Sequence, residues 1–160
     1  YFEFCNKNLS DWIKKYKNLI ITRTFSKAFG LASFRIGYCL SQSQNIDLLN
    51  KLRNPKSISQ FAQIAAISAL QDMAYMKKYV KEVAESRIYF IESMRKMGLK
   101  IYDSEANFAL AECKQNLYAM LETKGIFIRN YSHIIPNHYR ITIGTMSQMK
   151  RVIKTIAKVL

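Results

Sequence analysis

Residues that break regular structure are scarce in this 160-residue chain, which contains 5 Gly and 2 Pro. Disordered, collagen-like and many-turned all-β chains depend on such residues, so these classes are excluded. The chain also lacks an apolar run of the roughly 18 to 20 residues that a membrane-spanning helix needs. The longest candidate, near 63–70, is followed by Gln71 and Asp72. Because 49% of the residues are hydrophobic, we expect a soluble domain with a core.

Cysteine is also scarce, and the three residues Cys5, Cys39 and Cys113 lie far apart without CxxC spacing. This pattern favours reduced thiols over a disulfide framework or a zinc site. The first residues show neither the charged segment nor the apolar segment of a signal peptide, and no initial Met. The sequence therefore predicts a cytoplasmic protein, and a chain cut from a longer one.

Acidic residues are outnumbered, with 11 Asp+Glu against 25 Lys+Arg and a formal net charge of +14. A nucleic-acid-binding protein would show such an excess. The basic residues, however, form three clusters at helical spacing beside apolar residues, which favours solvated helix faces. These clusters are Lys14, Lys15 and Lys17; Lys77, Lys78 and Lys81; and Lys150, Arg151, Lys154 and Lys158. We expect no nucleic-acid partner, and a non-catalytic basic binding module is the alternative.

The hydrophobic pattern predicts a strand, a loop, a second strand and a helix at the start of the chain. The short apolar runs 19–22 and 36–40 are typical of strands, and 41–52 carries apolar residues at helical spacing. Asn54-Pro55 then interrupts the pattern, because Pro disfavours helix at the preceding residue and lacks an N–H donor.

A long helical region is predicted from Ser59 to Met97, which contains no Gly or Pro. Gly98 is a natural C-terminal stop. Since the region is long for one globular helix, we expect a break near 71–74 and a connection between two lobes. The remainder predicts a compact α+β lobe. Its expected strands are 100–102, 108–112, 126–130 and 139–144, and its expected helices are 116–124 and 147–160. Strict alternation in RITIGT at 140–145 predicts that Arg140, Thr142 and Gly144 face one side of the sheet and that Ile141 and Ile143 face the other.

The most informative segment is 22–38, TRTFSKAFGLASFRIGY. It places Lys27 after a strand, between the hydroxyls of Thr24 and Ser26 and eight residues before Arg35. A lysine amine can form a Schiff base with an aldehyde, while hydroxyls and a guanidinium bind a phosphate dianion. The segment therefore predicts a covalent lysine site beside a phosphate site.

This segment resembles the S-K-x-x-G-L-x-x-x-R-I-G-Y signature of fold-type I pyridoxal-phosphate aminotransferases, and within them most closely the histidinol-phosphate aminotransferase group. Further segments resemble the same family, in its order and at about its spacings. These are YFEF at 1–4, NF at 107–108, GIFIR at 125–129 and RITIGT at 140–145. The resemblance thus covers nearly the whole chain.

The resemblance implies an α/β fold in three parts. Residues 1–53 would form the end of the large α/β domain that binds pyridoxal phosphate. Residues 54–98 would form a long connecting helical region, and residues 99–160 a small α+β C-terminal domain.

Carried over to this chain, the resemblance makes Lys27 the Schiff-base lysine. It would also be the base that moves a proton between the substrate α-carbon and the cofactor C4′. Arg35, with Thr24 and Ser26, would bind the cofactor phosphate, and Tyr1 would hydrogen-bond the phenolic O3′. Thr24 and Ser26 as turn caps and Tyr1 as a frayed terminus are the structural alternatives.

For the substrate, the resemblance implies that Arg140, with Arg129, binds the anionic end, although Arg129 could also be a surface residue. The expected activity is a transaminase acting between an amino acid such as glutamate and a small phosphorylated carbonyl compound. Lys56 and Ser57 depart from the group, which has an aromatic residue and an amide at these positions, so an imidazole substrate is in doubt. The alternative activity is a related amino-acid-phosphate decarboxylase.

The family's acidic partner of the pyridine nitrogen lies three positions before the tyrosine that matches Tyr1, and so precedes this chain. The resemblance therefore implies a piece that binds pyridoxal phosphate poorly and does not turn over alone, and a homodimer when complete. His133 and His138 fall in an expected loop with no carboxylate close in sequence. We predict surface loop histidines there rather than metal ligands.

Overall fold

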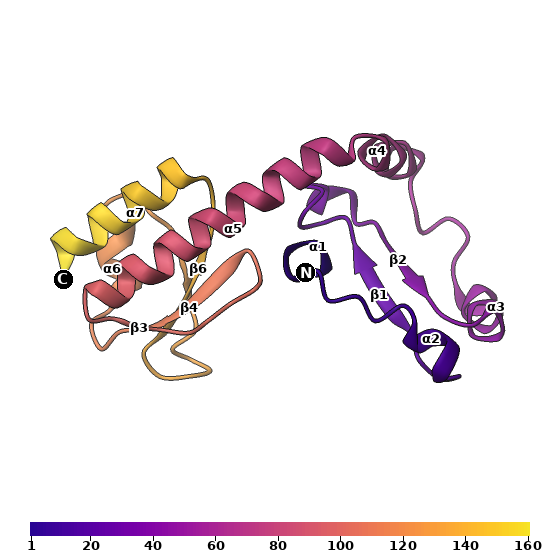
Figure 1. Ribbon diagram of the computed structural model, residues 1–160, viewed down its shortest axis with the longest axis horizontal. Helices are drawn as coiled ribbons and strands as arrows, with labels where there is room; N and C mark the ends of the chain where they lie inside the picture. The colour runs from indigo at the N-terminus through magenta and orange to yellow at the C-terminus, as the bar shows by residue number, and fades with distance from the viewer. The chain divides into compact units, whose positions relative to one another are not determined.

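Residues 1–160 are described by a computed structural model in which the chain divides into two units, Tyr1–Lys78 and Tyr79–Leu160 (Figure 1). The first unit is built on a two-stranded antiparallel sheet of β1 (Ile21–Thr24) and β2 (Gly37–Leu40). Both strands were predicted, although β1 begins two residues later than the apolar run. No helix of the chain is long and apolar enough to cross a membrane.

Three short helical turns of the first unit were not predicted. They are α1 (Phe2–Cys5), α2 (Trp12–Lys15) and the 3₁₀ helix η1 (Ala32–Phe34). Each is too short to show a helical repeat of apolar residues, so periodicity could not reveal them. The lysines at 14, 15 and 17 are exposed as predicted, but Lys17 lies beyond the end of α2.

The longer helices follow the predicted pattern. They are α3 (Ser43–Leu52), α4 (Gln60–Gln71) and α5 (Met73–Lys96). The predicted break lies at Asp72, which leaves the helical conformation (φ −110°, ψ 59°) and accepts a hydrogen bond from the backbone N–H of Tyr75. Gly98, with φ +78°, follows the end of α5 as predicted, because a left-handed residue there costs glycine little.

The core of the first unit joins the loop between the two strands to α4. Phe25 and Ile36, at the two ends of that loop, are buried with Ala62 and Ala66 of α4. Gly37 opens β2 where the strands approach closely, since a Cβ there would lie 2.6 Å from the carbonyl oxygen of Arg23. The glycine of the signature therefore lets the backbone of β2 pair with β1.

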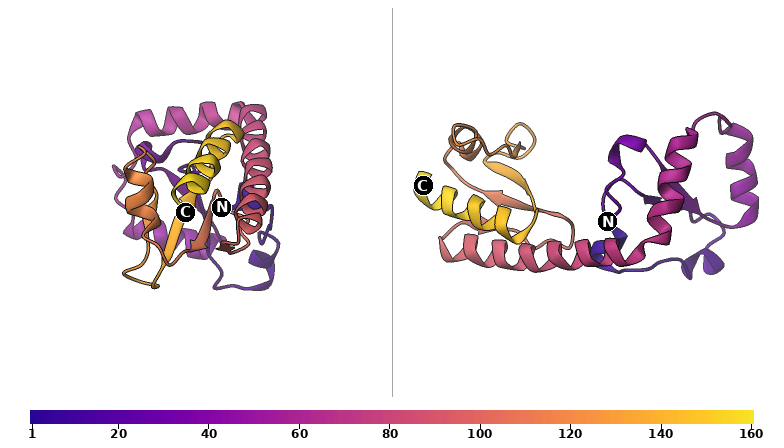
Figure 2. Two further views of the ribbon diagram at one scale, coloured as in Figure 1. Left: turned by 90° about the vertical axis from the view of Figure 1, so that its left-hand side faces the viewer. Right: turned by 90° about the horizontal axis from the view of Figure 1, so that it is seen from above.

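The second unit contains a four-stranded antiparallel sheet in the order β3-β4-β6-β5. Its strands are β3 (Lys100–Ile101), β4 (Phe108–Glu112), β5 (Arg129–Asn130) and β6 (His138–Thr142), and its helices after α5 are α6 (Leu117–Glu122) and α7 (Met146–Val159). All six elements were predicted, and β5 is shorter than expected. Figure 2 shows α7 beside the part of α5 that belongs to this unit.

One face of this sheet is apolar and the other polar. Ile141 and Ile143 are buried, whereas Arg140 is half-buried and Thr142 is exposed, which confirms the alternation predicted for this strand. Helix α7 places Val152 and Ile156 in the core, and its basic residues are exposed. The charged side chains of the sheet therefore lie on its other, polar face.

The prediction for His138 was wrong: it is 7% exposed and lies in β6, opposite Glu112 of β4. Its Nδ1 donates to the carbonyl of Pro136 (2.8 Å), and its Nε2 lies 3.1 Å from the hydroxyl of Tyr102. Strand β6 begins one residue earlier than the sequence indicated, which brings this histidine into the sheet. His133 is exposed in the loop, as predicted.

Glu112 also pairs with Lys100 on β3 at 2.7 Å. The hydrogen bond from Lys100 lowers the pKa of Glu112, and the same bond raises the pKa of Lys100. This end of the polar face is therefore satisfied by contacts within the chain.

Candidate functional site

The loop that carries Lys27 is fixed at its base by Phe25. The N–H of Phe25 donates to the carbonyl of Ile36 (3.3 Å), and its own carbonyl accepts from Leu31 (2.9 Å). The Phe25 ring is 5% exposed and lies 5.0 Å from the ring of Phe29. These contacts close the loop on itself, so that Lys27 occupies a defined position rather than a free tip.

Within the loop, Lys27 begins a turn in which its carbonyl accepts from the N–H of Gly30 (3.0 Å). Gly30 has φ +71°, a conformation that glycine adopts without strain. The Lys27 side chain is half-buried, and its Nζ lies 5.8 Å from the centroid of the Tyr1 ring. The predicted covalent lysine and the predicted tyrosine are therefore neighbours.

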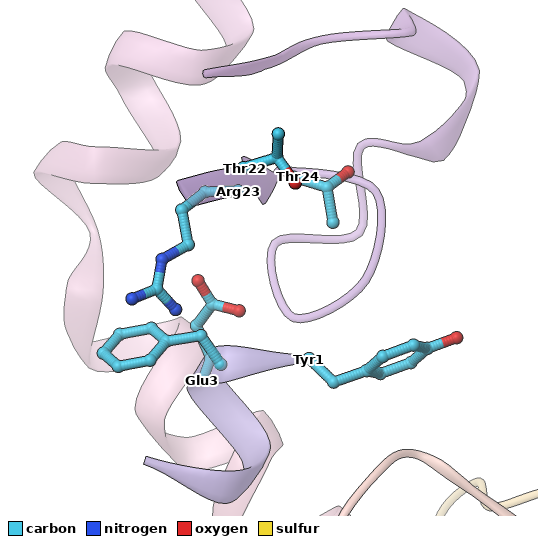
Figure 3. Close-up of a pocket in the computed structure, with 6 residues that line it drawn as sticks. Tyr1, Glu3, Thr22, Arg23 and Thr24 are labelled. Carbon is cyan, nitrogen blue, oxygen red and sulfur yellow. The ribbon is translucent and has the colours of Figure 1, made fainter. Parts of the chain in front are cut away.

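A pocket of about 360 Å³ lies beside Tyr1. Its lining residues are Tyr1, Phe2, Glu3, Thr22, Arg23 and Thr24. Figure 3 shows Tyr1 and Thr24 at one end of this pocket and Arg23 with Glu3 at the other. The structure thus brings together Tyr1, Thr24 and Lys27 from the predicted cofactor set.

Ser26 connects Thr24 to Lys27, because its backbone N–H donates to Thr24 Oγ1 (3.1 Å). Thr24 consequently has the role in a turn that was weighed as an alternative. That role uses its oxygen only as an acceptor, so the hydroxyl of Thr24 can still donate to a phosphate oxygen. The two interpretations of Thr24 are compatible.

Arg35 is exposed and ends η1 in the left-handed conformation, with φ +51° and ψ 44°. Such a backbone is uncommon for a residue other than glycine and is found at functional positions. Its Nη1 donates to the carbonyl of Ala32 (3.1 Å), which leaves further guanidinium donors for a ligand. By residue type, a lysine amine suits the aldehyde of a cofactor, and hydroxyls with a guanidinium suit its phosphate.

A second candidate site lies on the polar face of the sheet in the second unit, where Arg129 of β5 is the direct cross-strand partner of Arg140 of β6. Like charges placed opposite each other destabilise a sheet. The Nε of Arg140 is also buried without a hydrogen-bond partner, which costs about 1–3 kcal/mol. A bound anion would offset both the repulsion between the two arginines and the unpaired Nε. The pair is therefore suited to bind an anion.

Sequence reasoning missed the aromatic side chains that hold Arg140. Its guanidinium carbon lies 4.9 Å from the ring centroid of Phe108 and 5.8 Å from that of Tyr131. Strand alternation could have placed Tyr131 on the face of Arg129, but the pairing of β4 with β6 was needed to bring Phe108 there. The two rings restrict where the guanidinium can point.

Residues 1–156 match a family model described as aminotransferase class I and II. The chain is 48% identical over 163 residues to a dihydroxyacetone phosphate transaminase of Campylobacter jejuni subsp. jejuni, a match that covers 98% of this chain and 44% of that protein. It is 38% identical to a histidinol-phosphate aminotransferase of Sulfurisphaera tokodaii, over 100% of this chain and 44% of that protein.

Among solved structures, the chain is similar to a histidinol-phosphate aminotransferase of Sinorhizobium meliloti in complex with pyridoxal-5'-phosphate. The two are 31% identical with a TM-score of 0.78, over 92% of this chain and 43% of that one. The chain thus spans less than half the length of these relatives.

Proposed function

The chain belongs to the class I and II aminotransferases, and on that premise we propose that it provides the lysine-bearing part of a pyridoxal-phosphate-dependent transaminase. The observation that carries this proposal is the position of the Lys27 amine, 5.8 Å from the Tyr1 ring that lines the pocket with Thr24. Pyridoxal phosphate, when bound, supplies an aldehyde that reacts with a lysine amine and a pyridine ring that withdraws electrons from the substrate.

In this proposal Lys27 would hold the cofactor covalently, and its amine would serve as the base that carries a proton between the substrate α-carbon and the cofactor C4′. The half-buried position of Lys27 limits the water around the amine. Thr24, Ser26 and Arg35 bind the cofactor phosphate through charge-assisted hydrogen bonds. The hydroxyl of Tyr1 would donate to the phenolic O3′ and so orient the ring.

We propose that the substrate is a small phosphorylated carbonyl compound, which receives an amino group from an amino acid such as glutamate. The names of the relatives from Campylobacter jejuni and Sulfurisphaera tokodaii both refer to phosphorylated substrates. Arg129 and Arg140 would bind the anionic group, which is supported by the unpaired Nε of Arg140. Lys56, which is exposed where the histidinol-phosphate group has an aromatic residue, favours a substrate without an imidazole.

The test uses a completed protein, in which this chain is joined to the part of the Campylobacter jejuni relative that it does not cover. With glutamate and dihydroxyacetone phosphate, we expect formation of 2-oxoglutarate, and a higher kcat/KM than with the carbonyl form of histidinol phosphate. A decarboxylase would instead release CO₂ from an amino-acid phosphate without forming a keto acid. That result would contradict the proposed reaction.

Replacing Arg140 by Lys in the completed protein is expected to raise the KM for the phosphorylated substrate about 10-fold, because an ammonium cannot form two parallel hydrogen bonds to one anion. Arg140→Gln, which also removes the charge, should raise KM further. Steady-state kinetics provide the measurement, and Arg151→Lys, on the exposed face of α7, is the matched control. An unchanged KM in both Arg140 variants would remove this residue from the substrate site.

We further propose a homodimer as the complete state and the cytoplasm as its location. The three cysteines are free, which supports a reducing compartment. Sedimentation of the completed protein would test the dimer, and a monomer with full activity would contradict it.

A further inference from the structure

Arg23 lines the pocket beside Tyr1, and the function proposed above gives it no role. It lies on β1 next to Thr24, and its guanidinium carbon is 3.5 Å from the centroid of the Phe2 ring. Its Nη2 also donates to Asn8 Oδ1 (3.3 Å). Figure 3 shows the Arg23 side chain extending from the strand toward the segment that carries Glu3. One side chain therefore contacts the 1–8 segment at two points.

The 1–8 segment contains little regular structure of its own. Helix α1 has four residues and no side-chain cap at Tyr1, and a single helical turn is not stable by itself. Asn6 then takes a left-handed conformation (φ +52°), which turns the chain away from the helix. Contacts with β1 consequently help to decide where Tyr1 lies.

We propose that Arg23 is a positioning residue for the cofactor site: it holds the 1–8 segment against β1 and so keeps the Tyr1 ring beside the Lys27 amine. This inference rests on the proposed function, in which Tyr1 binds the cofactor. Arginine suits the task because its planar guanidinium stacks on a ring and donates hydrogen bonds in its own plane at the same time. A lysine ammonium would keep the charge but could not do both.

The first test measures hydrogen exchange of the Phe4, Cys5 and Asn6 amides, which donate to the carbonyls of Tyr1 and Phe2. It uses the completed protein without cofactor. Arg23→Gln and Arg23→Lys should each speed this exchange about 5- to 20-fold, because the turn opens when its anchor is lost. Lys51→Gln, an exposed change on α3, is the control and should leave the exchange unchanged.

The second test measures the pH dependence of the absorbance of bound pyridoxal phosphate. Arg23→Gln and Tyr1→Phe should shift the midpoint pH of this absorbance change in the same direction. In the Tyr1→Phe background, Arg23→Gln should add little, because both changes remove the same contact with O3′. A merely structural role for Arg23 would give an independent effect.

The outcomes separate this inference from the proposed function. Faster exchange in the Arg23 variants, without cofactor bound to Lys27 in the parent protein, would support the anchoring by Arg23 and contradict the proposed function. Normal cofactor binding in the parent, with unchanged hydrogen exchange in both Arg23 variants and an unchanged absorbance midpoint in Arg23→Gln, would overturn the role of Arg23. Additive midpoint shifts in the double variant would likewise contradict an action through Tyr1.

Discussion

Replacing Lys27 by Ala in the completed protein is expected to lower kcat for transamination by at least about 10³-fold, since both covalent binding and proton transfer depend on this amine. The fold should be unaffected. Lys27 is half-buried in a turn whose hydrogen bonds involve its backbone, and alanine keeps that backbone. Single-turnover rates with pre-bound glutamate and pyridoxal phosphate provide the measurement.

Two controls make the Lys27 result specific. Lys51→Ala, on an exposed helix face of the same unit, should retain the parent rate. Lys27→Arg keeps the charge but lacks a nucleophilic amine at neutral pH, so it should be as inactive as Lys27→Ala. If either Lys27 variant keeps a tenth or more of the parent rate, another residue performs the chemistry.

The second large effect concerns the 160-residue chain by itself. We expect it to bind pyridoxal phosphate about 100-fold more weakly than the completed protein and to show no turnover, because a two-stranded sheet is at best marginally stable alone. Helix α4 also carries exposed apolar side chains, including Phe61 at 79% and Ile64 at 55%. A helix that is apolar on several sides is normally covered in a stable protein.

Titration with pyridoxal phosphate, followed by absorbance, compares the affinity of the isolated chain with that of the completed protein.

The pyridine nitrogen of the cofactor gives a second reason for weak binding by the isolated chain. The acid expected to pair with this nitrogen lies before Tyr1 in the family pattern. Adding the uncovered part of the Campylobacter jejuni relative as a separate polypeptide should restore some binding. Full turnover by the isolated chain would contradict this expectation.

The sequence predicted the long elements and the signature loop because their signals are local. The break at Asp72 followed from the length of the helical region, and the placement of Thr24 and Ser26 beside Lys27 followed from one contiguous segment. Arg140 was placed on the polar face by strand alternation alone. Each of these features depends on spacing within a single element.

The features that the sequence did not reveal depend on pairing between distant segments. The burial of His138 arises from strand register, which joins β6 to Glu112. The contact of Arg23 with Phe2 joins residues far apart in the chain, and the apposition of Arg129 and Arg140 requires the β5–β6 pairing. No local pattern encodes such contacts, so only the fold could identify them.

The most direct test of the central claim is to map the lysine that binds the cofactor. The completed protein is incubated with pyridoxal phosphate, reduced with borohydride and digested, and the modified peptides are identified by mass spectrometry. We predict that the reduced cofactor is found on Lys27 at about one equivalent per chain, and that Arg35→Gln lowers this yield at low cofactor concentration. Modification spread over exposed lysines, with Lys27 unmodified, would contradict the assignment of this loop as the cofactor site.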